Sequence, residues 1–136
     1  MTDPLLRLPG YSLRRAANAT MAELAVRLGA IGLRQVDATV MILIDSEPGT
    51  TASAIGRTLD IQRANMVPLL KRLDDAGLID KKPIDGKSQG VELTSAGKAK
   101  LAEALDVIET FETELLERVP PEHRDHLLPA LNALWH

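Results

Sequence analysis

The sequence predicts a mainly α-helical protein with one two-stranded β-hairpin, organised around residues 50–94. Four apolar residues in this region recur with helical spacing and indicate an amphipathic helix, namely Met66, Leu69, Leu70 and Leu73. Asp85-Gly86 lies between two short runs that contain apolar residues, a pattern typical of a hairpin turn. The chain has one Trp, one Tyr and one Phe, so its core must consist of aliphatic side chains and Met. Such a core suits packed helices.

Two helices are predicted before residue 50. The first follows a tail of residues 1–10, has Ser12 as its N-cap and ends near Gly29–Gly32. Its apolar residues step by three or four: Leu13, Ala17, Met21, Leu24, Leu28 and Ile31. The second spans 34–46, and its run 40–44 is apolar all round, which indicates the most buried helix. Its Val and Ile residues make a strand the competing interpretation, but the flanking helices favour a helix.

Residues 50–94 are predicted to form a helix-turn-helix followed by a two-stranded wing. Thr50 or Thr51 caps a third helix, and a fourth runs from 62 to 76 and stops at Gly77. Strands at 78–82 and 89–93 flank a tip at 83–88. Pro68 lies inside the fourth helix and removes one backbone hydrogen bond. Either that helix bends there or it begins later.

A long fifth helix and a short sixth helix complete the chain. Thr94 or Ser95 caps the fifth, which Val119-Pro120-Pro121 ends. One of its faces is apolar: Leu101, Leu105, Ile108, Phe111 and Leu115. The sixth carries Leu127, Leu128, Leu131 and Leu134 to Trp135. The first, fifth and sixth helices have more apolar surface than one small core can bury, and a symmetric dimer would cover the excess.

The segment Ile61–Ile79, followed by Asp85-Gly86-Lys87 and Val91-Glu92-Leu93-Thr94, resembles the MarR (multiple-antibiotic-resistance regulator) family of winged-helix repressors. The ending Leu73-x-x-x-Gly77-Leu78-Ile79 and the junction Leu93-Thr94-x-x-Gly97 carry the resemblance together, and it extends from about residue 7 to the C-terminus. It implies a homodimeric, sequence-specific DNA-binding regulator, most simply a repressor of pseudo-palindromic operators. In a single domain of this kind, residues 1–33 and 95–136 would dimerise and 34–94 would bind DNA. The alternative is a winged-helix protein-interaction module.

The fourth helix carries the candidate base readers. Arg63 and Asn65 lie at its start, where Arg can pair with guanine and Asn with adenine through two hydrogen bonds each. A solvated polar face is the alternative. Lys71 and Arg72 are predicted to contact phosphates or to pair with Asp75. The full predicted DNA-binding set is Thr51, Arg63, Ala64, Asn65, Pro68, Lys71, Arg72, Lys87 and Ser88.

The predicted wing tip departs from the family pattern. The resemblance implies an arginine beside the aspartate, whereas this sequence has Gly86-Lys87. Arginine enters narrow minor grooves better because its guanidinium is less strongly hydrated. We therefore expect a weaker, more flexible wing in which Lys87 and Ser88 contact DNA. We expect Asp85 to hold the shape of the tip.

The distribution of charge fits a DNA-binding lobe better than the formal net charge of −3 does. Residues 1–36 carry five basic and two acidic side chains, and residues 51–87 carry seven basic and five acidic ones. Residues 95–136 carry four basic and eight acidic side chains. Binding depends on the local field at the phosphates rather than on the total charge. The small local excess predicts modest affinity.

Several other functions are disfavoured by composition. The absence of cysteine excludes thiol redox sensing, disulfides and thiolate metal sites. His123-x-x-His126 lacks a third ligand close in sequence, and Glu109, Glu112, Glu114 and Glu117 are typical of a solvated helix face. Without a clustered nucleophile, base and acid or a glycine-rich phosphate loop, we expect neither an enzyme nor a bound cofactor. No basic leader and no long apolar run is present, so we expect a cytoplasmic protein without a membrane segment.

The resemblance also implies a small organic effector, often a phenolic or lipophilic anion, bound between the dimerisation helices and the DNA-binding lobe. Tyr11, Arg15 and Met41 are the candidates to line such a space. A packed core with no ligand is the alternative. The scarcity of aromatic residues argues weakly against planar aromatic ligands.

Overall fold

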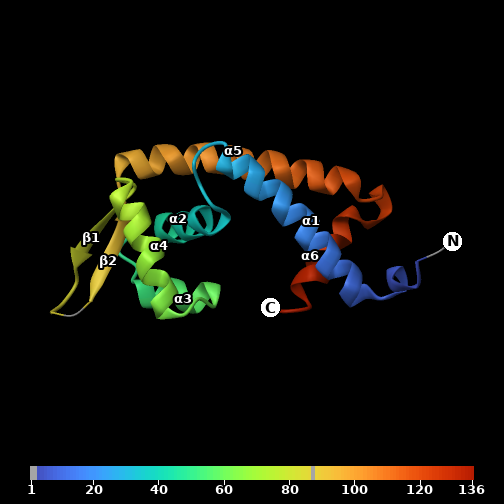
Figure 1. Cartoon of the computed structure of the whole chain (residues 1–136), viewed down its shortest axis with the longest axis horizontal. Helices are drawn as coiled ribbons and strands as arrows, with labels where there is room; N and C mark the ends of the chain where they lie inside the picture. The colour runs from blue at the N-terminus through green and yellow to red at the C-terminus, as the bar shows by residue number, and fades with distance from the viewer. Residues whose placement is uncertain (1–2, 87) are drawn as a thin grey trace. The chain divides into compact units, whose positions relative to one another are not determined.

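The computed structural model describes residues 3–86 and 88–136 and is mainly helical (Figure 1). The chain forms two compact units: a central unit, Ala25–Leu105, and a terminal unit, Met1–Leu24 with Asp106–His136. The elements in chain order are η1 (Pro4–Arg7), α1 (Pro9–Gly29), α2 (Gln35–Ser46), α3 (Ala52–Leu59), α4 (Arg63–Asp75), β1 (Ile79–Pro83), β2 (Gln89–Leu93), α5 (Ser95–Arg118), η2 (Pro121–His123) and α6 (Arg124–Asn132). The predicted order of four helices, a hairpin and two helices is confirmed.

The N-terminal segment differs from the prediction. A tail to residue 10 and an N-cap at Ser12 are both wrong, because a short 3₁₀ helix precedes α1 and α1 begins at Pro9. Asp3 caps the 3₁₀ helix by accepting the Leu5 N–H at 2.9 Å. The Ser12 N–H already donates to the Leu8 carbonyl at 3.0 Å, a helical bond. Pro suits the first helical position because its φ is preset and it lacks an N–H that would have no helical partner there.

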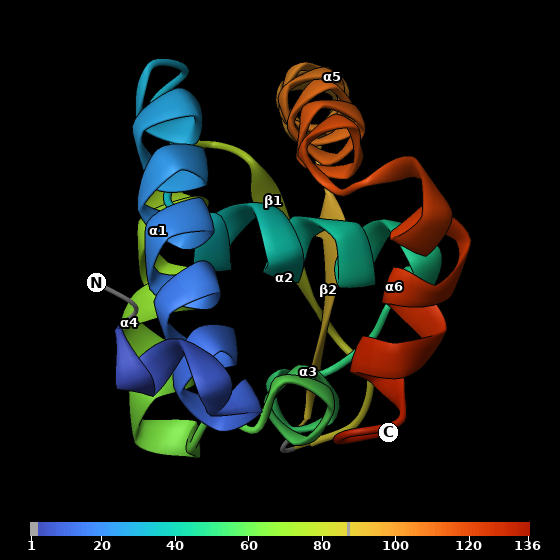
Figure 2. The same cartoon turned by 90° about the vertical axis from the view of Figure 1, so that its right-hand side faces the viewer.

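Helix α2 is the buried centre of the central unit, which confirms the helical interpretation of residues 34–46. Val40, Met41 and Ile44 have no exposed surface. The helix crosses the middle of the unit and packs against α3 and β2 (Figures 1 and 2). A capping box opens it, since the side chain of Asp37 accepts the backbone N–H of Arg34 at 2.9 Å.

Helices α3 and α4 form the predicted helix-turn-helix. Thr51, not Thr50, caps α3 and accepts the Ala54 N–H at 3.1 Å. The predicted apolar stripe of α4 is buried, with no member more than 5% exposed: Met66, Leu69, Leu70 and Leu73. Helix α4 begins at Arg63, one residue after the predicted start at 62, and continues through Pro68. The lost hydrogen bond is tolerated on an exposed face, where both Ala64 and Pro68 lie.

The end of α4 determines where the hairpin starts. Gly77 has φ +74°. Its N–H donates to the backbone carbonyl of Asp74 at 2.9 Å, and the Leu78 N–H donates to the backbone carbonyl of Leu73 at 3.0 Å. These bonds form a Schellman motif, as the predicted stop at Gly77 requires. Because Leu78 is used there, β1 begins one residue later than predicted. Strands β1 and β2 pair antiparallel from Ile79↔Leu93 to Pro83↔Gln89.

The base of the hairpin is joined to the start of α5. Thr94 donates its hydroxyl to the Gly77 carbonyl at 2.7 Å and accepts the Gly97 N–H at 2.9 Å, so it is the predicted cap of α5. The Thr94 N–H also donates to the Leu78 carbonyl at 3.0 Å. We call these residues the wing joint: Gly77, Leu78, Thr94 and Gly97.

In the terminal unit, Glu23 of α1 and Arg118 of α5 form a two-point ion pair with contacts of 2.7 and 2.9 Å. The pair raises the pKa of Arg118 through its hydrogen bond to Glu23. Phe111 is 1% exposed. Helix α6 has no buried residue, and it ends at Asn132 rather than at Trp135.

Candidate nucleic-acid interface

A groove of about 720 Å³ lies between the starts of α3 and α4 and the β-hairpin. Among the described residues, three basic side chains line it, Arg57, Arg63 and Lys81, against one acidic side chain, Asp85. Thr51, Ser53, Ser88 and Gln89 add polar groups that can hydrogen bond to phosphate or base oxygens. The groove is therefore locally positive although the whole chain carries a formal charge of −3. We call it the reading groove.

Arg63 and Asn65 lie at the first and third positions of α4 and are exposed, as is Ala64 between them. They follow from the local structure: Gln62 is the N-cap, and the apolar stripe buries the opposite side of the helix. Neither side chain has a hydrogen bond or ion pair with another described residue. Both are thus presented at a helix N-terminus, where backbone N–H groups also favour anions.

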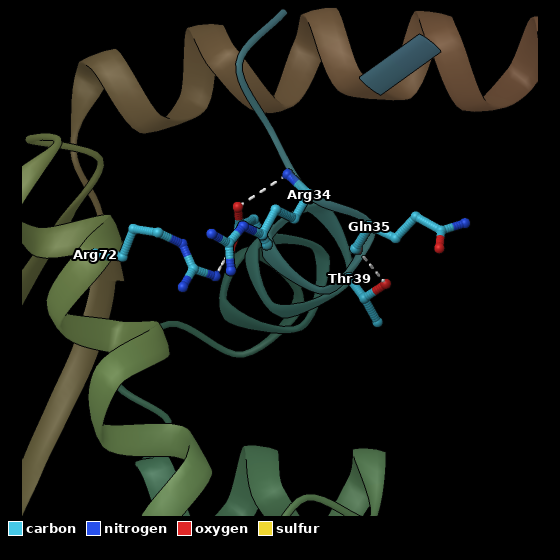
Figure 3. A network of polar contacts seen from close by, with 5 residues as sticks. Arg34, Gln35, Thr39 and Arg72 are labelled. Atoms are coloured by element: carbon cyan, nitrogen blue, oxygen red, sulfur yellow. Dashed lines mark hydrogen bonds and ion pairs between the residues drawn. The ribbon is translucent and has the colours of Figure 1, made fainter. Parts of the chain in front are cut away.

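Lys71 and Arg72 have different partners. Lys71 pairs with Asp75 at 2.8 Å on an exposed surface, and this hydrogen bond raises the pKa of Lys71. Arg72 does not pair with Asp75; its guanidinium binds Asp37 of α2 (Figure 3). The predicted pairing with Asp75 is therefore observed for Lys71 and wrong for Arg72, while phosphate contact by Lys71 stays a prediction. Asp37 lies 35 residues away in sequence, so no local pattern pointed to it.

Besides the strand pairing, side chains of the described residues stabilise the wing at its middle and at its tip. Lys82 of β1 pairs with Glu92 of β2 at 2.8 Å, and this hydrogen bond raises the pKa of Lys82. At the tip, the Ser88 N–H donates to Asp85 at 2.9 Å, which agrees with the expected role of Asp85 in holding the shape. Ser88 lines the reading groove. Lys87, also predicted to contact DNA, lies outside the described residues.

Two basic groove residues were missed by the sequence prediction, Arg57 and Lys81, as were the polar Ser53 and Gln89. Arg57 lies in α3 and Lys81 in β1, so only the fold brings them beside α4. The available signal was weak. Arg57 is exposed and follows the buried Ile55 and Gly56 in α3. Lys81 lies two residues after the buried Ile79, on the same face of β1, so strand alternation did not single it out.

The predicted effector residues lie in different units. Tyr11 and Arg15 contact each other in the terminal unit, where Arg15 donates to the Tyr11 hydroxyl at 2.8 Å. The guanidinium of Arg14 lies 5.7 Å from the centre of the same ring. Met41 has no exposed surface and belongs to the core of the central unit.

Within the described ranges, no three His, Asp or Glu side chains gather as a metal-ligand set. None of the helices described is both long and apolar enough to cross a membrane.

Comparisons with known proteins agree with this geometry. A family model for a winged helix DNA-binding domain matches residues 33–97. The transcriptional repressor CouR bound to a 23-mer DNA duplex is 31% identical, with a TM-score of 0.91 over 100% of this chain and 99% of that one. CouR bound to p-coumaroyl-CoA is 30% identical, with a TM-score of 0.82 over 98% and 96%.

Two more distant relatives share the same architecture or sequence. A MarR family protein of Mycobacterium tuberculosis, solved with salicylic acid, is 23% identical with a TM-score of 0.74 and covers 93% of this chain and 95% of its own. A curated protein of Thauera aromatica, described as a transcriptional regulatory protein for the hcr operon, is 26% identical over 93% of this chain and 78% of its own length.

Proposed function

The chain belongs to the MarR family of winged-helix transcriptional regulators, and from that premise we propose that it is a homodimeric repressor of a pseudo-palindromic operator. The reading groove carries this proposal, because it places exposed Arg63 of α4 beside basic residues of α3 and β1. Asn65 does not line the groove but is exposed two residues further along the same first turn of α4. Two copies would insert α4 into successive major grooves about 34–36 Å apart.

Arg63 and Asn65 are the proposed base readers. A bidentate pair of Arg with guanine or of Asn with adenine is worth about 1–3 kcal/mol of discrimination. The likeness to CouR bound to a 23-mer DNA duplex supports DNA binding by this fold. Contacts from Thr51, Ala64, Pro68, Lys71 and Ser88 would add phosphate, sugar and van der Waals interactions around them. Lys87 keeps its proposed place at the wing tip.

The terminal unit supports dimerisation, because it exposes large apolar side chains that a monomer leaves in water. The examples are Leu5, Leu6, Leu8, Leu13, Met21, Leu116, Leu128, Leu134 and Trp135, each at least 41% exposed. We infer that a second copy covers them and that residues 1–33 and 95–136 form the dimerisation segments around the DNA-binding lobe, 34–94. Sedimentation equilibrium tests this, and a stable monomer at micromolar concentration would refute it.

A small-molecule effector is the second part of the proposal. Because a relative 30% identical over 98% of this chain is a repressor bound to p-coumaroyl-CoA, we propose a coenzyme A thioester of an aromatic acid. Tyr11, Arg15 and Met41 remain the candidate contacts. The thioester should release the protein from its operator, whereas the free acid and free coenzyme A should not. Release by none of the three would refute this choice of effector.

The operator experiment has two stages. Genomic fragments bound at a stated salt concentration are selected and the protected sequence is mapped. Arg63→Ala and Asn65→Ala are then measured on that operator and on a scrambled duplex. Each should weaken operator binding by about 5–150-fold, from the 1–3 kcal/mol per bidentate pair, and change scrambled-duplex binding little. Lys98→Ala is the matched charge-loss control on exposed α5 and should have little effect.

The contrary outcome is equally specific. If no palindrome is protected and Arg63→Ala leaves the regulatory activity of the protein intact, the protein does not read DNA with α4. A winged-helix module that binds another protein would then account for the fold.

A further inference from the structure

We propose that Asp37 is a positioning residue for DNA reading, acting through Arg72 to set the orientation of α4. The proposal rests on the proposed function, since it assumes that α4 reads bases. Asp37 lies in α2 and Arg72 lies in the last turn of α4, and both belong to the central unit. Neither residue lines the reading groove.

The two carboxylate oxygens of Asp37 bind two different parts of the chain, at Arg34 and Arg72, which are both labelled in Figure 3. Oδ2 accepts the backbone N–H of Arg34 at 2.9 Å, which fixes the first turn of α2. Oδ1 accepts from Nη2 of Arg72, which attaches the far end of α4. The Asp37 side chain is 5% exposed, so this charge is buried and needs both partners. One buried carboxylate thus ties α4 to the start of the central helix.

Arg72 is suited to anchoring rather than to phosphate contact. Its side chain is 36% exposed, less than the 69% of its neighbour Lys71. Its Nε atom is buried and has no hydrogen-bond partner among the described residues. The guanidinium therefore lies inward against Asp37, even though this position leaves its Nε without a hydrogen bond. A side chain placed to reach DNA phosphates would instead extend outward as Lys71 does.

The anchor lies at the opposite end of α4 from the reading residues. Arg72 follows Arg63 by nine positions, or about 13 Å along a helix that rises 1.5 Å per residue. A rotation of about 5° around the anchor would move the start of α4 by about 1 Å, enough to spoil a base contact that needs 2.7–3.2 Å. The apolar stripe of α4 resists separation but is non-directional, whereas a charge-assisted hydrogen bond fixes orientation.

Three variants test the proposal in the full-length protein: Asp37→Asn, Arg72→Gln and the pair together. Asparagine keeps an oxygen for the Arg34 N–H, so the cap of α2 is retained. Each single variant should weaken operator binding at least tenfold while binding to a scrambled duplex stays within twofold. The double variant should be no weaker than the worse single one, because both remove the same link. Arg72→Lys, which keeps the charge, should recover part of the affinity.

The salt dependence distinguishes anchoring from phosphate contact. Affinity for DNA falls as salt rises, and losing one phosphate contact makes the slope of log affinity against log salt shallower by about one. Arg72→Gln should leave this slope unchanged. The matched control is Lys71→Gln, which removes the same charge at the neighbouring residue and should make the slope shallower. A shallower slope in Arg72→Gln together with normal operator affinity in Asp37→Asn would overturn the proposal.

Thermal unfolding separates anchoring from general stability. If the variants unfold at lower temperature but bind the operator normally well below that temperature, Asp37 is only structural and the proposal fails. Wild-type binding is measured in the same series. Wild-type protein that recognises no operator would refute the proposed function, whereas intact wild-type binding with unaffected variants would refute this inference alone.

Discussion

Replacing Gly97 with alanine should strongly destabilise the wing joint. A Cβ atom at Gly97 would lie 2.0 Å from the Leu78 carbonyl oxygen and 3.0 Å from its carbon. The two backbone segments must therefore separate by more than an ångström. The Leu78 oxygen also accepts the Thr94 N–H at 3.0 Å, and Thr94 binds the neighbouring Gly77 carbonyl at 2.7 Å. Both bonds would lengthen as the segments move apart.

The size of the effect follows from these contacts. Overpacking in a closely packed site costs about 1–3 kcal/mol, and two weakened hydrogen bonds add about 0.5–1.5 kcal/mol each. We expect Gly97→Ala to lower the free energy of unfolding by about 2–6 kcal/mol, measured by urea denaturation followed by circular dichroism. Operator affinity should also fall, because the wing starts and ends at this joint.

The matched control is Gly29→Ala at the end of α1, where an added Cβ would meet nothing within 4 Å. This substitution should be neutral or slightly stabilising, by up to about 1 kcal/mol. A difference of less than about 0.5 kcal/mol between Gly97→Ala and wild type is the size expected at an exposed surface. That result would show that the joint relaxes and that the close approach of Gly97 to Leu78 is not structurally important.

Three further outcomes are expected. Thr51→Ala should cost about 1 kcal/mol of unfolding free energy by loss of the α3 cap, whereas Thr51→Ser should not; equal losses would refute the capping role. Met41→Ala should cost about 2–5 kcal/mol in thermal denaturation, since Met41 has no exposed surface, and a smaller loss would mean that the core closes around the cavity. The pKa of Lys82 is raised above 10.5 by its hydrogen bond to Glu92. The pair therefore stabilises the wing below that pH and loses its effect above it, so the stability difference between wild type and Lys82→Met should shrink as pH rises from about 8 to about 11. A difference that stays constant over this range would contradict that assignment.

The helices were predictable because their signals are local. Apolar residues three and four apart marked α4, and a run of five apolar residues marked α2. The start of α1 was not predicted, because Ser12 is a residue type common at N-caps and residues 1–10 were interpreted as a tail. The structure uses Pro9, which needs no N–H donor at that position. Proline in α4 was correctly seen as a missing hydrogen bond, but its exposed position, which makes the loss tolerable, depends on the fold.

The candidate site was predictable only where it lies on one element. Arg63 and Asn65 could be placed at the start of α4 from periodicity, and the structure presents both to solvent. Arg57 of α3 and Lys81 of β1 line the reading groove with Arg63, and the Asp37–Arg72 pair spans 35 positions. Such groupings depend on tertiary packing, which no spacing rule encodes. Neighbouring basic residues can therefore have different partners, as Lys71 pairs with exposed Asp75 and Arg72 with buried Asp37.

The wing joint bears on how specificity in this protein could be altered. Both strands of the hairpin leave from a single point, held by Thr94 and by the contact between Gly97 and Leu78. A small rotation at that point would swing the distal turn along the duplex while the turn itself kept its residues. Selections for a shifted minor-groove footprint should therefore yield substitutions at the foot of the hairpin as well as at its end.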